Sequence, residues 1–217
     1  SLNDDLFHEL AIRYYLAGKQ EKSMALYQRR WLMSPESKRE LQNWILIKLF
    51  SAPGDIHVSS EQLKALDESD FSSILVKIAC HFLANDKEGK RIELINIQKI
   101  KNVNYRVLFD DLIHSLSNMK NNRQYLHHIL EVFYLNDNAH SDKALKYLES
   151  KFTTSPESLF ARFLKVQILK DALSFESALE NALLFSEDLS HQNIFLNMAA
   201  VIYAKTNRRE EAIKLFR

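Results

Sequence analysis

The sequence predicts an all-α protein, and three observations support this fold class. The 217 residues include only three glycines and three prolines, whereas all-β folds need many tight turns built from such residues. Apolar residues recur at the three- and four-residue spacing of a helix face along most of the chain. Pairs of such segments follow one another at intervals of about 33–34 residues, which is typical of a helical repeat.

The composition limits the classes of function. A hydrophobic content of 46% is enough for a folded core. The formal net charge of +1 gives no general attraction to nucleic acid or anionic lipid. The single cysteine, Cys80, cannot form an internal disulfide and lies in an apolar stretch at 74–82, so we expect a small buried side chain. No apolar run approaches the roughly 18 residues of a membrane-spanning helix.

The first repeat begins with a helix predicted over residues 3–17. Phe7, Leu10, Ala11 and Tyr14 have the spacing of one helix face. Ala11 is small where a second helix must approach closely. Gly18 suits the left-handed backbone position that ends such a helix. These residues therefore predict a tight turn into a second, antiparallel helix.

The second helix of this repeat is predicted over residues 20–33. Ser23 is the small residue that would face the first helix, and Tyr27 would fill the space beside it. Pro35 disfavours helical backbone at the residue before it and so ends the helix. The unit from about 3 to 35 is the most regular part of the chain.

The same pattern returns near the end of the chain, over 189–217. Ala11 and Ser23 are 12 residues apart, as are Ala200 and Ala212. Asn207 stands at the turn, and asparagine is the residue that tolerates a positive φ best after glycine. Two copies with the same internal spacing indicate a repeat.

The two units resemble the tetratricopeptide repeat family. The residues that carry the resemblance are Phe7, Leu10, Ala11, Tyr14, Gly18, Tyr27 and Pro35 in the first unit, and Leu196, Ala199, Ala200, Tyr203, Ala212 and Phe216 in the last. Phe7 and Leu196 occupy the position where the family often has tryptophan. The resemblance implies a right-handed α-α superhelix of about six helix pairs. It also implies a protein that binds proteins or peptides.

The helical spacing predicts thirteen helices. They span about 3–17, 20–33, 36–51, 60–67, 70–84, 88–100, 104–118, 121–135, 140–152, 156–171, 174–186, 189–205 and 208–217. A partial third copy of the motif consists of Ala144, Leu148 and Pro156.

Two stretches, 51–60 and 103–120, interrupt the regular spacing. The first is a long loop in which Ser59 or Ser60 caps a short helix. The second holds a helix that lengthens one repeat by about 17 residues, so we expect a kink or a change of phase there. We interpret residues 1–217 as a single repeat unit. Because the chain begins abruptly and ends within a helical pattern, we expect it to be a piece of a longer protein.

The sequence contains no recognised catalytic or cofactor motif, so we predict neither an enzyme nor a cofactor site. No GxSxG, GxGxxG, P-loop or HExxH pattern occurs. No two histidines have i, i+3 or i, i+4 spacing, and the adjacent rings of His127 and His128 are expected to point to different sides, so we predict no metal. The acid pairs Asp4-Asp5, Asp110-Asp111 and Glu210-Glu211 are interpreted as solvated helix starts or faces. The small basic clusters are interrupted by acids, which argues against nucleic acid as a partner.

In the family that the chain resembles, the first helix of each pair lines the groove that binds a partner. The corresponding face of the first unit carries Asp5, His8, Glu9, Ile12 and Tyr15, opposite the Leu10–Tyr14 packing face. The matching positions of the last unit are Ile194, Asn197, Val201 and Lys205. This mixture of apolar and polar side chains suits an extended peptide or a docked helix. The acids of the first unit argue against a clamp for the carboxylate tails of chaperones.

We therefore predict a scaffold that binds a protein or peptide partner in its groove. We expect it to act within a larger assembly, such as a bacterial secretion, envelope or polysaccharide-export system. The alternative is a chaperone-like or sensor module that captures a specific polypeptide, and a more remote one is an enzyme or RNA binder on an α-solenoid. The helix at 208–217 would expose Ile213 and Phe216, so self-association through this helix is also expected. The compartment stays open.

Overall fold

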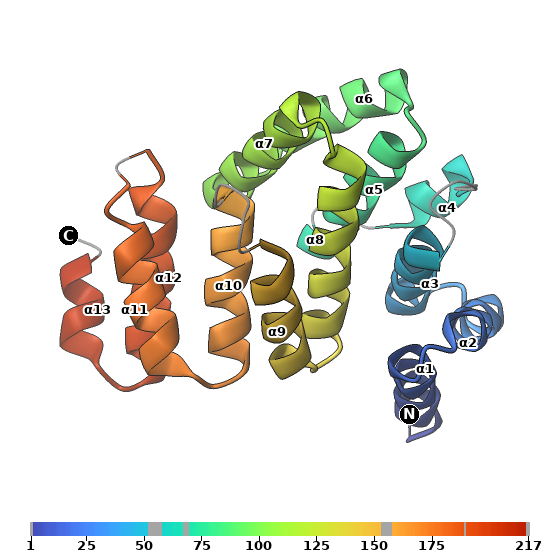
Figure 1. Ribbon diagram of the computed structural model, residues 1–217, viewed down its shortest axis with the longest axis horizontal. Coiled ribbons are helices and arrows are strands. Elements are labelled where there is room, and N and C mark those ends of the chain that lie inside the picture. Colours follow the sequence, from blue (N-terminus) through green and yellow to red (C-terminus); the bar gives the residue numbers. More distant parts are fainter. Residues whose placement is uncertain (1, 52–57, 67–69, 153–157, 189, 216–217) are drawn as a thin grey trace. The chain divides into compact units, whose positions relative to one another are not determined.

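The computed structural model describes residues 2–51, 58–66, 70–152, 158–188 and 190–215. These residues form thirteen helices and no strand (Figure 1). Consecutive helices pack against each other in adjacent pairs, as α1 does with α2 and α11 with α12. The predicted all-α repeat fold is therefore confirmed. No helix among the described residues is both long and apolar enough to cross a membrane.

The chain divides into two compact units. The first comprises Ser1–Ile100 and Arg123–Leu130, and the second comprises Lys101–Asn122 and Glu131–Arg217. The helices of the first unit are α1 (Leu2–Leu16), α2 (Gln20–Met33), α3 (Lys38–Ser51), α4 (Ser60–Ala65), α5 (Phe71–Leu83) and α6 (Lys87–Gln98). Those of the second are α7 (Val103–Asn118), α9 (Ser141–Phe152), α10 (Leu159–Asp171), α11 (Phe175–Phe185), α12 (Gln192–Lys205) and α13 (Arg209–Leu215). The continuous helix α8 (Asn122–Asp137) contributes residues to both.

The helix boundaries follow from side chains that cap them. Ser59 accepts a hydrogen bond from the backbone N–H of Gln62, whose side chain accepts one from the N–H of Ser59. This capping box starts α4. Of the two caps that the sequence offered, Ser59 and Ser60, the structure uses Ser59. Asp70, Asp86 and Ser158 cap α5, α6 and α10 more simply, each with a side-chain oxygen that accepts one backbone hydrogen bond. Of the loop predicted over 51–60, residues 52–57 lie outside the described residues, as do Pro156 and Phe216.

Five turns between paired helices share one backbone geometry. Each contains a residue with a positive φ, and the next helix begins two residues later. These residues are Gly18, Asn85, Ala139, Leu173 and Asn207. In every case the N–H of this residue bonds the carbonyl three positions earlier, and the following N–H bonds the carbonyl five positions before itself. This is the Schellman arrangement that ends a helix. The predictions for Gly18 and Asn207 are confirmed.

The positions of these turns reveal the repeat length. Ala139, Leu173 and Asn207 are 34 residues apart from one to the next. Asn85 and Ala139 are 54 residues apart, which is 20 more than one repeat. The additional residues include α7. The helix predicted over 104–118 as an insertion is therefore present between two regular pairs.

Small buried residues follow four of the five turns. They lie five positions after the residue with positive φ and are Ser23, Ala144, Ala178 and Ala212. The hydroxyl of Ser23 donates a hydrogen bond of 2.6 Å to the backbone oxygen of Ala11. Both residues are fully buried, as expected for the close approach of α1 and α2. In the α5–α6 pair, Gly89 provides the space, because a Cβ there would lie 1.9 Å from Nδ1 of His81.

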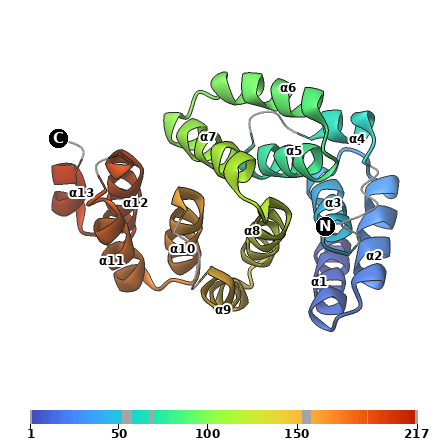
Figure 2. The same ribbon diagram turned by 45° about the horizontal axis from the view of Figure 1, so that its top comes forward.

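The inserted helix α7 packs against α10 within the second unit (Figure 2). The rings of Phe109 and Phe160 are 6.1 Å apart, and both side chains are fully buried. Asp111 on α7 lies beside the start of α10, where the backbone N–H of Phe160 favours its charged form. Asp111 had been interpreted as part of a solvated acid pair. Instead, partial burial raises its pKa, against the smaller opposing influence of His191 and His114.

Candidate binding groove

A cavity of about 180 Å³ lies between the start of α7, α10 and α12 in the second unit. Its walls are Asn102, Asn104 and Tyr105 at the start of α7, Phe163, Gln167 and Lys170 on α10, and Ile194, Asn197, Met198 and Val201 on α12. The lining therefore combines aliphatic and aromatic surface with amide groups and one ammonium group.

Helical spacing explains why these residues meet. Phe163, Gln167 and Lys170 are separated by four and three positions, so they share one face of α10. The residues of α12 in the wall are separated by three, one and three positions and also form one face. At the third wall, the Asn102 side chain caps α7 by accepting bonds from the N–H groups of Asn104 and Tyr105. This cap fixes the end of α7 that borders the cavity.

The ammonium group of Lys170 is held in place and poorly solvated. It donates a hydrogen bond of 2.7 Å to Oε1 of Gln167 and lies 3.7 Å from Oδ1 of Asp171. Burial lowers the pKa of Lys170, the negative charge of Asp171 opposes this effect, and the positive charge of Lys205 adds to it. The positive charge of Lys205 beside the partly buried ammonium group of Lys170 creates a local preference for an anionic group.

The structure brings together most of the binding residues predicted for the last unit. Ile194, Asn197 and Val201 all line the cavity, with Ile194 buried and Val201 exposed over 45% of its surface. Lys205 is not a wall residue but is close enough to lower the pKa of Lys170. Three of the four predicted positions thus line one cavity, and their role in binding stays a prediction.

The residues predicted for the first unit do not form such a surface. Ile12 and Tyr15 are buried, with 2% and 7% of their surfaces exposed. Nδ1 of His8 lies 3.3 Å from the hydroxyl of Tyr27 on α2, and its Nε2 lies 2.8 Å from Nη2 of Arg39 on α3.

The expected packing face of α1 also needs correction. Leu10 is 43% exposed, although it was assigned to that face, whereas Ala11 is buried as expected. Asp5 and Glu9 are exposed, and Glu9 pairs with Arg13 at 2.8 Å. The buried surface of α1 therefore includes side chains that had been assigned to the groove.

Sequence reasoning missed the contributions of α7 and α10 to the cavity. The wall residues of α10 have helical spacing, which is visible in the sequence. The same spacing occurs on helix faces that line no cavity, so it does not identify these residues. Asn102 precedes the predicted helix at a typical capping position. The sequence did not reveal that the inserted helix α7 packs against α10. This packing brings the start of α7 to the cavity, where it forms the third wall.

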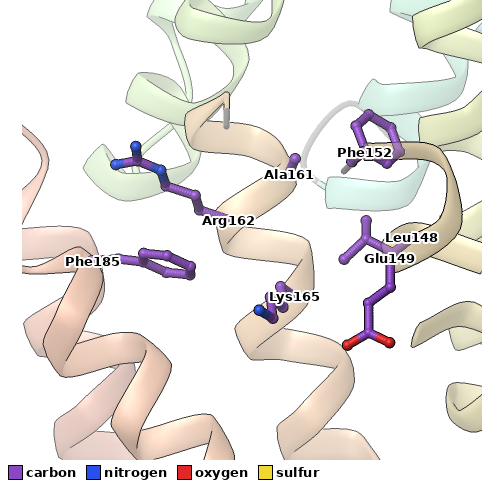
Figure 3. A pocket seen from close by; sticks show the side chains of 7 residues that line it. All are labelled: Leu148, Glu149, Phe152, Ala161, Arg162, Lys165 and Phe185. Atoms are coloured by element: carbon purple, nitrogen blue, oxygen red, sulfur yellow. The ribbon is translucent and has the colours of Figure 1, made fainter. Parts of the chain in front are cut away.

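A second cavity, of about 170 Å³, lies between α9, α10 and α11. Figure 3 shows α10 in the middle, with side chains of α9 on one side and Phe185 of α11 on the other. The lining residues are Leu148, Glu149, Phe152, Ala161, Arg162, Lys165 and Phe185. The guanidinium of Arg162 lies 5.5 Å from the centre of the Phe185 ring, and its Nη1 lies 3.6 Å from Oδ2 of Asp188. These contacts link neighbouring repeats, and none of the predicted binding residues lies here.

Reactive groups are few in the part of the chain that the structure describes. The thiol of Cys80 is buried, and this burial raises its pKa to about 12, against a smaller opposing effect of the Lys48 charge. A thiol with such a pKa is not a nucleophile at neutral pH. Among the described residues, one group of potential metal ligands converges: His127, His128 and Glu131 on α8.

Comparisons with known proteins give no relative on which the assignment of this groove could rest. No protein-family model, no curated protein and no solved structure matches the chain.

Proposed function

We propose that the chain is a protein-binding module that holds a short segment of a partner protein in the cavity between α7, α10 and α12. The observation that supports this proposal is the meeting of Ile194, Asn197 and Val201, which were selected as binding positions from the repeat pattern, in one cavity. The first helix of a repeat pair presents these residues, as the resemblance to tetratricopeptide repeats implies.

The chemistry of the walls indicates an extended, acidic segment with an apolar anchor. Ile194, Met198 and Val201 offer aliphatic surface for one side chain of the partner. The amide groups of Asn104 and Asn197 can donate to and accept from a peptide backbone. Lys170 and Lys205 favour a carboxylate nearby, because an anion relieves their mutual repulsion.

The size of the cavity also favours a peptide over a small-molecule cofactor. Pockets for small ligands usually measure about 300–1,000 Å³. The cavity here is about 180 Å³, which suits the anchoring side chain of a longer segment. The rest of that segment would lie on the exposed surface of α12.

The test is selection of binders from a peptide library displayed on phage, followed by affinity measurement with fluorescently labelled synthetic peptides. We expect the selected peptides to share an acidic residue and an apolar residue. We expect Asn197→Ala and Val201→Asp each to weaken binding at least about tenfold, since each change removes or repels part of a buried contact. Lys205→Glu should weaken binding of the acidic peptides in the same direction.

Matched controls lie on neighbouring helices outside the cavity. Lys214→Glu on α13 makes the same charge change as Lys205→Glu, and Leu184→Asp on α11 replaces an apolar residue that is 56% exposed. Both control variants should bind like the unmodified chain. If the control variants weaken binding as much as the cavity variants do, or if neither set weakens it, the peptides bind elsewhere. Either result would overturn the proposal.

A further inference from the structure

Helix α8 carries three potential metal ligands on successive turns. They are His127, His128 and Glu131. One imidazole nitrogen of each histidine and one carboxylate oxygen of Glu131 lie within 4.8 Å of one another. Glu131 is four positions after His127 and three after His128, the two spacings that bring side chains together on a helix. Because all three residues lie within five consecutive positions of one continuous helix, α8 itself fixes their spacing.

The two imidazole rings lie closer than their adjacency in the sequence suggested. Their centres are 5.8 Å apart and their planes meet at 78°. Ligands of a tetrahedral zinc ion are about 3.3 Å from one another, given bond lengths of about 2.0–2.1 Å. The atoms within 4.8 Å would therefore need movements on the order of 1 Å, which rotation about side-chain bonds supplies. All three residues are half-buried, so their rotation is partly restricted by neighbours.

Tyr147 on α9 orients the carboxylate of this group. The phenol hydroxyl of Tyr147 donates a hydrogen bond to the carboxylate of Glu131. Hydrogen bonds of this kind, from outside the ligand set, fix the direction of ligands in metal sites.

We propose that His127, His128 and Glu131 form a binding site for a divalent transition-metal ion of the zinc class. Two imidazoles and one carboxylate are ligands that zinc prefers, whereas calcium and magnesium prefer oxygen ligands alone. Three protein ligands leave a coordination position for water or for a group of a partner. The prediction of no metal rested on the spacing of the histidines alone and left out Glu131 as a third ligand.

The direct test is titration of the untagged, chelator-treated chain with Zn²⁺ in a calorimeter. We expect one tight equivalent per chain. His127→Ala and Glu131→Gln should each weaken this binding by more than the 10–100-fold that loss of an outer hydrogen bond typically causes. Tyr147→Phe should weaken it by about tenfold, because the carboxylate keeps its charge and loses only its orientation.

Two further measurements separate the site from general binding to histidines. His114→Ala removes an exposed histidine of α7 that is not part of the group and should leave the tight equivalent unchanged. Co²⁺ in place of Zn²⁺ should give the visible absorption of a four-coordinate ion in the unmodified chain, which requires no variant to fold. Absence of a tight equivalent in the unmodified chain, or its retention in Glu131→Gln and His127→Ala, would overturn the assignment. Circular dichroism of each variant verifies that α8 is intact.

Discussion

Replacement of Gly18 by alanine isolates the energy of a left-handed turn. Gly18 has a φ of +72°, and a Cβ built at this position has no atom within 4 Å. Gly18→Ala therefore introduces no steric overlap with neighbouring groups. Its effect on stability comes from the backbone alone.

The expected loss follows from two opposing contributions. Left-handed backbone costs a residue with a Cβ about 1–2 kcal/mol. Alanine also restricts the unfolded chain, which stabilises the folded state by about 0.4–1 kcal/mol. The difference is a loss of about 1 kcal/mol, which for a chain of this size lowers Tm by about 2–4 °C. Ala139→Gly, at an exposed residue with a φ of +61°, reverses both contributions and should stabilise by a similar amount.

Urea unfolding with tryptophan fluorescence is the appropriate assay for Gly18→Ala. Trp31 and Trp44 both belong to the first unit, and their rings stack with centres 6.1 Å apart. Because repeats can unfold separately, a probe beside the altered turn is needed. For Ala139→Gly, far-ultraviolet circular dichroism follows all helices. Gly18→Asn should lose less than Gly18→Ala, since asparagine tolerates this backbone. A stabilised Gly18→Ala variant, or a destabilised Ala139→Gly variant, would refute the reasoning.

Three other substitutions test separate contacts. Ser23→Ala should lower the free energy of unfolding by about 1 kcal/mol, measured in urea, since one hydrogen bond is lost while alanine fits the equivalent position of other repeats. Gly89→Ala should cost about 1–3 kcal/mol, because its Cβ would overlap His81, and a melting temperature equal to that of the unmodified chain would contradict this contact. Asp111→Asn should raise Tm at pH 7, because a raised carboxyl pKa means that ionisation of Asp111 disfavours the folded state. The gain should shrink as the pH falls through this raised pKa and should vanish below about 4, the ordinary pKa of the carboxyl group. A gain that is larger at low pH would contradict the sign.

The helices were predictable because local signals define them. All thirteen occur, and their ends lie within three residues of the predicted positions among the described residues. Two of the five turns, at Gly18 and Asn207, were predicted, since glycine and asparagine are the residues that favour a positive φ. Asn85 has the same preference, although it was not singled out from the sequence. Ala139 and Leu173 have no such preference. Their backbone is set by the pairing of the helices on either side, which the identity of one residue does not reveal.

The residues that line the candidate groove were predictable only on α12. On α12 the periodicity identified residues that line a cavity. On α1 the apolar side chains are distributed around the helix, so periodicity could not distinguish the buried side from the open one. The contact of Arg39 on α3 with His8 shows how a later helix covers part of this face. Contacts between neighbouring repeats decide which side chains of α1 are exposed. The spacing of apolar residues within one helix does not contain this information.

The buried thiol of α5 has a practical consequence for experiments on this chain. Maleimide reagents attack thiolates, so the native protein should resist labelling at Cys80. A cysteine introduced at Val201 would then carry a fluorophore at one position without removal of the native residue. Conversely, slow labelling of Cys80 in the unmodified chain would report how often α5 opens to solvent.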